Sequence, residues 1–177
     1  MSSANPLDQA DALLAEGRAG EALKLSEPLA AAADAPHAAL STHAAILKAL
    51  RRHEEALAFN EQATRRFATS GVAWHNLAAT LGDLGRGEAA RAAIREAFKR
   101  GLDAPQSWSV YARALLATGE IDEAEQAYRE SLKRAPGEVK VAMEFANIVW
   151  MHQGDAAAAS ISLALASNSG PGAPPPR

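Results

Sequence analysis

Apolar residues recur along this chain with the spacing of amphipathic helices. In the stretch 105–138, four of them fall at i, i+3, i+4 and i+7, namely Trp108, Tyr111, Ala112 and Leu115. A second stripe begins at Ala124 and ends before Pro136, because proline disfavours helix at its own position and at the residue before it. The pattern therefore predicts two helices of about 12 residues, joined by a short turn at Gly119 into an antiparallel hairpin.

The same pattern returns every 34 residues. Two columns in this register are alanine at every occurrence: Ala10, Ala44, Ala78, Ala112 and Ala146 in one, and Ala22, Ala56, Ala90, Ala124 and Ala158 in the other. A third column is always aliphatic: Leu13, Leu47, Leu81, Leu115 and Val149. A small residue at a fixed place in each hairpin indicates a close approach of two helix backbones. The period thus predicts a series of stacked helical hairpins.

Composition narrows the functional classes. With 177 residues, 48% of them hydrophobic, the chain is long and apolar enough to bury a core. A net charge of -3 gives no electrostatic footprint for nucleic acid or for an anionic membrane. The absence of cysteine excludes disulfides, thiolate nucleophiles and cysteine-ligated metals. No stretch has the pattern of a signal peptide or the length of a membrane span, so we expect a cytoplasmic protein without membrane contact.

The repeated residues resemble the tetratricopeptide repeat (TPR). The family's pattern of large, small and proline positions is met by Trp108, Tyr111, Ala112, Leu115, Ala124, Tyr128, Ser131 and Pro136, and in the preceding repeat by Trp74, Leu77, Ala78, Leu81, Ala90, Ile94 and Ala97. The other repeats depart from it. His43 and Asn60 stand where large apolar residues are usual, Pro28 predicts a kinked or short second helix in the first repeat, and Gly154 comes one place late in the fifth.

This resemblance implies an all-α fold, a right-handed α-solenoid of antiparallel helix hairpins with about ten helices. We expect one domain over residues 3–167, followed by a flexible Gly/Pro-rich tail over 168–177. The expected repeats are 3–36, 37–70, 71–104, 105–138 and 139–167.

The resemblance also implies a concave groove lined by the first helix of each repeat. The groove positions include Ser41, Thr42 and Lys48 in the second repeat, and the candidate binding residues beyond them are His75, Asn76, Asp83, Gln106, Ser109, Arg113, Lys140, Glu144 and Asn147. An Asn amide can exchange hydrogen bonds with one peptide unit of an extended ligand, although Asn76 and Asn147 could equally be solvated helix residues. The expected partner is therefore an extended peptide or a partner protein.

One known TPR subclass forms a carboxylate clamp, in which basic and Asn residues hold the acidic end of a partner chain. Only Asn76 matches that pattern here, while Ser41, Ala45, Gln106 and Val110 occupy its other positions. We therefore expect binding by another mode.

The sequence supports an enzymatic function less well than a binding function. The glycine-rich stretch around Gly82 and Gly85 could suggest a phosphate loop, but its 34-residue register places it at an interhelical turn, where Gly85 would end a helix in a left-handed conformation. The triplet that begins at His53 has H-x-E spacing, yet the matching iron site belongs to a β-barrel. We expect no catalytic residue, metal or cofactor. The function that follows is a scaffold or adaptor; the alternative is a non-catalytic N-terminal TPR arm of a larger bacterial oxygenase, sulfotransferase or glycosyltransferase.

The C-terminal segment adds one hypothesis. From Ala156 to Pro176 no residue is charged, whereas a terminal repeat usually needs a polar outer face. Ile161, Leu163 and Leu165 would then form an apolar interface with a second copy of the chain or with a further domain.

Overall fold

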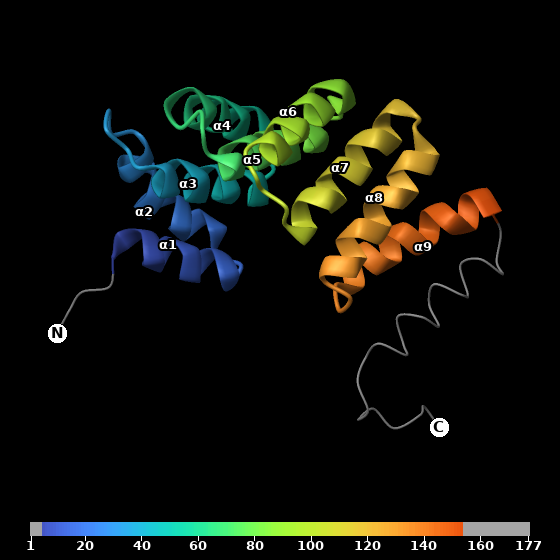
Figure 1. Ribbon diagram of the computed structural model, residues 1–177. Helices are drawn as coiled ribbons and strands as arrows, with labels where there is room; N and C mark the ends of the chain where they lie inside the picture. The colour runs from blue at the N-terminus through green and yellow to red at the C-terminus, as the bar shows by residue number, and fades with distance from the viewer. Residues whose placement is uncertain (1–4, 154–177) are drawn as a thin grey trace, which may run out of the picture. The chain divides into compact units, whose positions relative to one another are not determined.

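The computed structural model describes residues 5–153, and these residues form nine α-helices and no strand (Figure 1). The helices are α1 (Pro6–Ala15), α2 (Ala19–Ala30), α3 (His37–Ala49), α4 (His53–Arg66), α5 (Gly71–Asp83), α6 (Gly87–Lys99), α7 (Pro105–Thr118), α8 (Ile121–Arg134) and α9 (Val139–Gln153). The all-α prediction is confirmed. The expected tenth helix, the tail over 168–177, Gly154 and Ala158 lie outside the described residues.

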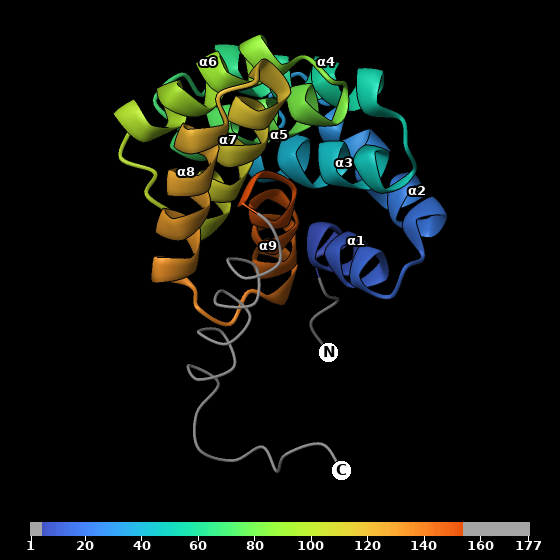
Figure 2. The same cartoon turned by 90° about the vertical axis from the view of Figure 1, so that its right-hand side faces the viewer.

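Consecutive helices pack as hairpins, with α1 on α2, α3 on α4, α5 on α6 and α7 on α8. Neighbouring hairpins also meet, because α2 packs on α3, α4 on α5 and α8 on α9. The chain forms two compact units, residues 1–102 with α1–α6 and residues 103–177, of which α7–α9 are described. Figure 2 shows the helices of each unit from a second side.

The recurring alanines lie where the helices are closest. In the first unit all six members of the two columns are at most 2% exposed, namely Ala10, Ala22, Ala44, Ala56, Ala78 and Ala90. In the second unit Ala112 and Ala124 are fully buried beside Tyr128 and Phe145, whose rings stack at 6.0 Å. Because a larger side chain at these crossings would push the helices apart, the alanine columns follow directly from hairpin packing.

The turns between paired helices share one backbone conformation. Positive φ angles occur at Gly17 (77°), Arg51 (62°), Gly85 (71°) and Gly119 (86°), which are spaced by the same 34 residues. This confirms that Gly85 ends its helix in the left-handed region. Only glycine adopts that region without strain, so Arg51 is the exception among the four.

The departures from the repeat pattern are accommodated locally. Helix α2 continues through Pro28 to Ala30 and has the length of about 12 residues expected of a repeat helix, so the proline does not end it. His43 is 3% exposed, and its Nδ1 lies 2.8 Å from the buried Ser26 hydroxyl. A polar pair thus replaces the usual apolar contact between α2 and α3.

None of the described helices is both long enough and apolar enough to cross a membrane.

Candidate functional site

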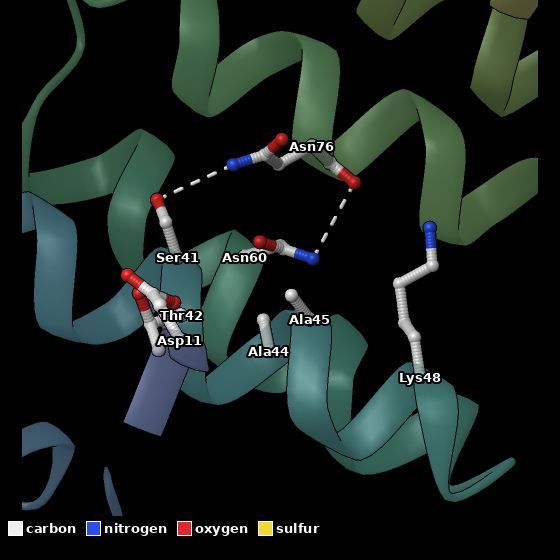
Figure 3. Close-up of a pocket in the computed structure, with 8 residues that line it drawn as sticks. All are labelled: Asp11, Ser41, Thr42, Ala44, Ala45, Lys48, Asn60 and Asn76. Carbon is white, nitrogen blue, oxygen red and sulfur yellow. Dashed lines mark hydrogen bonds between the residues drawn. The ribbon is translucent and has the colours of Figure 1, made fainter. Parts of the chain in front are cut away.

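A pocket of about 280 Å³ opens in the first unit, bounded by α1, α3, α4 and α5 (Figure 3). Five of its lining residues come from α3, and the others from α1, α4 and α5: Asp11, Ser41, Thr42, Ala44, Ala45, Lys48, Asn60 and Asn76. Ser41, Ala45 and Lys48 are spaced at i, i+4 and i+7, so one face of α3 forms a wall of the pocket. The pocket combines small side chains, which leave room, with polar groups from four helices.

Asn76 is positioned by the neighbouring repeat. Its side-chain Nδ2 donates a hydrogen bond to the Ser41 hydroxyl at 3.2 Å, which joins α5 to α3 (Figure 3). Among the described residues, no side chain or backbone group donates to its Oδ1. Asn76 is thus held in one orientation, and its Oδ1 remains an unused acceptor.

Asn60 carries a buried acceptor without a protein partner. Its Nδ2 donates to the Thr80 hydroxyl at 2.9 Å and to the Asn76 backbone carbonyl at 3.4 Å. A backbone carbonyl can only accept, so these bonds fix which end of the amide is nitrogen. The Oδ1 atom is buried in a residue that is 1% exposed, and it accepts no hydrogen bond from the protein. An unsatisfied buried acceptor costs about 1–3 kcal/mol, which a donor entering the pocket would recover.

The charges around the pocket are not balanced within it. The Lys48 ammonium forms an ion pair with the Asp83 carboxylate of α5 at 2.9 Å, and His53 Nδ1 lies 4.0 Å from the same carboxylate oxygen. The positive charge of Lys48 is therefore already neutralised. Asp11 is exposed and has no ion pair in residues 5–153, so the pocket keeps one negative charge.

The structure brings together only some of the predicted binding residues of the first unit. Asn76 lines the pocket, and Asp83 acts on it through Lys48. His75 is partly exposed on α5 but does not line the pocket. Gly82 lies in the last turn of α5, and a Cβ placed there would meet no atom within 4 Å. The face of α5 beside Gly82 is therefore open.

In the second unit the predicted residues lie on α7 and α9. Gln106, Arg113, Lys140 and Asn147 are exposed, which keeps them accessible to a partner. Ser109 is buried, and its hydroxyl donates to the Gln106 carbonyl one turn earlier at 2.9 Å.

Glu144 is half-buried and accepts a hydrogen bond from the Tyr128 hydroxyl at 3.3 Å. Burial and the charge of Glu144 raise the pKa of Tyr128 well above its usual range. Tyr128 therefore stays a neutral donor. The binding role of the six predicted second-unit residues remains a prediction.

Both carboxylates of the triplet that begins at His53 form ion pairs. Glu54 forms an ion pair with Arg86 at 2.7 Å and Glu55 with Arg52 at 2.6 Å, and the hydrogen bond from Arg52 lowers the pKa of Glu55. In the part of the chain that the structure describes, no three residues among His, Cys, Asp and Glu gather as a metal ion requires.

Two polar residues of the pocket, Asp11 and Asn60, are not among the predicted groove residues. The sequence shows Asn60 only as a polar residue at a position that is usually apolar, and this polarity was the signal of a polar site. Asp11 lies 34 residues before Ala45, which also lines the pocket, so extending the groove register into the first repeat would have found it. Ile161, Leu163 and Leu165, the predicted interface, lie outside the described residues.

Comparisons with known proteins agree with this fold. The family model described as tetratricopeptide repeat matches residues 75–139. No curated protein sequence matches the chain. Among solved structures, TTC0263, a thermophilic TPR protein of Thermus thermophilus, is similar with a TM-score of 0.80 and 18% identity, over 93% of this chain and 90% of that one.

Two further solved structures are similar at low identity. PilF of Pseudomonas aeruginosa has a TM-score of 0.78 and 15% identity, over 94% of this chain and 76% of its own. MamA of Desulfovibrio magneticus, from residue 41 to its end, has a TM-score of 0.73 and 13% identity, over 91% of both chains. At such identities the likeness concerns the fold alone. The family match at residues 75–139 and the shared fold along the chain confirm the tetratricopeptide-repeat resemblance found in the sequence.

Proposed function

We propose that this protein is an interaction scaffold that binds an extended peptide, or an extended segment of a partner protein, at the pocket between α1, α3, α4 and α5. The observation that carries the proposal is that two residues lining a pocket with room for a side chain, Asn60 and Asn76, each have an amide oxygen without a protein donor. An extended peptide leaves its backbone N–H groups unpaired, and these can donate to such acceptors.

The lining also supports a binding mode other than a carboxylate clamp. A clamp needs free cations, but Lys48, the one cation in the lining of this pocket, is paired with Asp83. Ser41 and Ala45, which occupy clamp positions, carry no charge. The alternative role, a non-catalytic arm of a larger bacterial enzyme, stays a prediction.

A displayed library of random peptides, selected on the full 177-residue chain, tests the proposal. Peptides recovered from the selection are synthesised, and their dissociation constants are measured by fluorescence anisotropy. We expect Asn76→Ala to weaken their binding about fivefold, because a hydrogen bond worth about 1 kcal/mol is lost.

The matched control is Gln126→Ala, which removes an exposed amide from α8. It should leave the dissociation constants unchanged. Failure to recover any binding peptide, or equal binding by Asn76→Ala and the wild type, would count against the proposed function at this pocket.

A further inference from the structure

The polar groups left unused in the pocket can all accept hydrogen bonds, and the Asp11 carboxylate and the Asn60 Oδ1 can only accept. We propose that the pocket selects a primary ammonium group of the bound peptide, from a lysine side chain or from a free N-terminus. This inference rests on the proposed peptide-binding function, and it names the group that the peptide must present. The Asp11 carboxylate, the Asn60 Oδ1 and the hydroxyls of Ser41 and Thr42 together form the acceptor set.

The first argument comes from Asn60. Its Oδ1 can only accept, it is buried, and the protein gives it no donor. Figure 3 shows this oxygen on the side of the amide that faces Ser41, away from the Asn76 carbonyl that takes the Nδ2 hydrogen. A ligand atom beside it must therefore be a donor.

The second argument comes from charge. Lys48 is neutralised by Asp83, and Asp11 has no cationic partner in residues 5–153. Figure 3 shows the Asp11 carboxylate reaching from α1 toward Thr42 and Ser41. A positively charged donor is favoured here because its attraction to Asp11 acts next to a partly desolvated pocket.

The third argument comes from the number and arrangement of acceptors. An ammonium has three donors that diverge from one nitrogen, and the pocket offers oxygens from three helices: Asp11 of α1, Ser41 or Thr42 of α3, and Asn60 of α4. The Ser41 oxygen already accepts from Asn76 Nδ2, yet a hydroxyl oxygen has a second lone pair. At about 280 Å³ the pocket suits a single side chain or chain end.

Other occupants fit less well. A carboxylate would meet acceptors and an uncompensated Asp11. A guanidinium favours a planar, bidentate carboxylate contact over several diverging single acceptors. A calcium ion takes six to eight oxygens, usually with several carboxylates, and this lining supplies only that of Asp11.

The test uses the full chain labelled with ¹⁵N and four small probes. Nα-acetyl-lysine N-methylamide carries a side-chain ammonium, and alanine N-methylamide carries a free α-ammonium. Nα-acetyl-norleucine N-methylamide keeps the aliphatic stem without charge, and Nα-acetyl-arginine N-methylamide carries a guanidinium. The readout is the NMR shift of the side-chain NH₂ signals of Asn60 and Asn76, which line the pocket directly.

We expect saturable shifts with the lysine probe, the alanine probe or both, and the stronger of the two identifies the source of the ammonium. Asp11→Asn should weaken binding of that probe about tenfold, because a charge-assisted hydrogen bond is lost. Asp34→Asn is the control of equal charge, since Asp34 is exposed in the α2–α3 loop and does not line the pocket. It should bind like the wild type.

The inference is overturned if neither ammonium probe shifts the two amides at concentrations up to about 50 mM, the weak end expected of such small ligands. It is also overturned if the norleucine or arginine probe, or calcium chloride, gives equal shifts, or if Asp11→Asn has no effect. These outcomes are separable from the proposed function. Peptides that bind in an Asn76-dependent way without any need for an ammonium would leave the scaffold function standing and refute this selection.

Discussion

The Asn60 amide donates a hydrogen bond to the Thr80 hydroxyl at 2.9 Å, across 20 positions of sequence and between α4 and α5. Both residues are buried, and the Thr80 hydroxyl in turn donates to the Asn76 carbonyl at 3.0 Å. These two hydrogen bonds form a polar relay from Asn60 through Thr80 to the Asn76 carbonyl, at a place where the repeat pattern usually has a large apolar side chain. The same relay leaves Asn60 Oδ1 facing the pocket, so the packing of these repeats and the chemistry of the site depend on one side chain.

Thr80→Val tests the strength of this relay. Valine has nearly the same shape but no hydroxyl, so Asn60 Nδ2 would retain only its 3.4 Å bond to the Asn76 carbonyl. We expect the free energy of unfolding, measured by urea denaturation, to fall by about 1–2 kcal/mol. Thr80→Ser keeps the hydroxyl and should lose distinctly less; equal losses in the two variants would show that the relay contributes nothing.

The helical architecture was predictable because it depends on local and periodic information. The 34-residue spacing of alanines such as Ala44 and Ala78 predicts hairpins and their close crossings, and both alanines are buried there. The roles of His43 and Asn60 were not predictable in the same way. Their partners, Ser26 and Thr80, lie on other helices 17 and 20 residues away, and sequence spacing alone does not pair such side chains.

The candidate site was predictable only in part. Asn76 was identified because its position on α5 follows from the register of the repeat. Ser109 follows from the same rule, but it is buried and bonds to its own helix. A helical register gives the direction of a side chain without saying what packs over it, and this is why the pocket emerged from the structure.

Arg51 offers a test of the repeated turn. Its φ of 62° lies in the left-handed region that glycine occupies at the equivalent positions 17, 85 and 119. A residue with a Cβ pays roughly 1–2 kcal/mol for that conformation, so Arg51→Gly should stabilise the protein by about 1 kcal/mol after the extra entropy of the unfolded glycine is subtracted.

Arg51→Ala is the control, since it removes the same exposed charge and keeps a Cβ. Its melting temperature should stay near that of the wild type. A gain in melting temperature for alanine equal to that for glycine would assign the effect to charge and contradict the strain at this turn.

Two glycines of α5 should respond in opposite directions to alanine. A Cβ at Gly71 would lie 2.8 Å from the Leu102 Cβ and 3.2 Å from the Ala97 carbonyl, so Gly71→Ala should cost about 1–3 kcal/mol by overpacking. A Cβ at Gly82 meets nothing within 4 Å, and Gly82→Ala should add about 0.5–1 kcal/mol through helix propensity. Thermal and urea unfolding of both variants measure the two signs, and a stabilising Gly71→Ala would contradict the close α5–Leu102 contact.

His43 should make the stability depend on pH in a defined window. Burial lowers the pKa of His43 below its ordinary value of 6.5, and the carboxylates of Glu27 and Glu55 oppose this only in part. As the pH falls below about 6.5, His43 therefore binds a proton in the unfolded chain more readily than in the folded chain. The free energy of unfolding decreases as a result. His37 acts in the same direction, because its burial also lowers its pKa.

We expect the melting temperature to hold above pH 7 and to fall as the pH is lowered from about 6.5 toward 5, at constant ionic strength. Replacing His43 by Gln should flatten this fall, and the double variant with His37→Gln should flatten it further, whatever each variant does to the melting temperature at pH 7.5. The carboxylates with lowered pKa, such as Glu55 and Glu130, have ordinary values of 4.5 and act below this window. The same slope in the wild type and in both variants would show that the buried histidines are not the titrating groups.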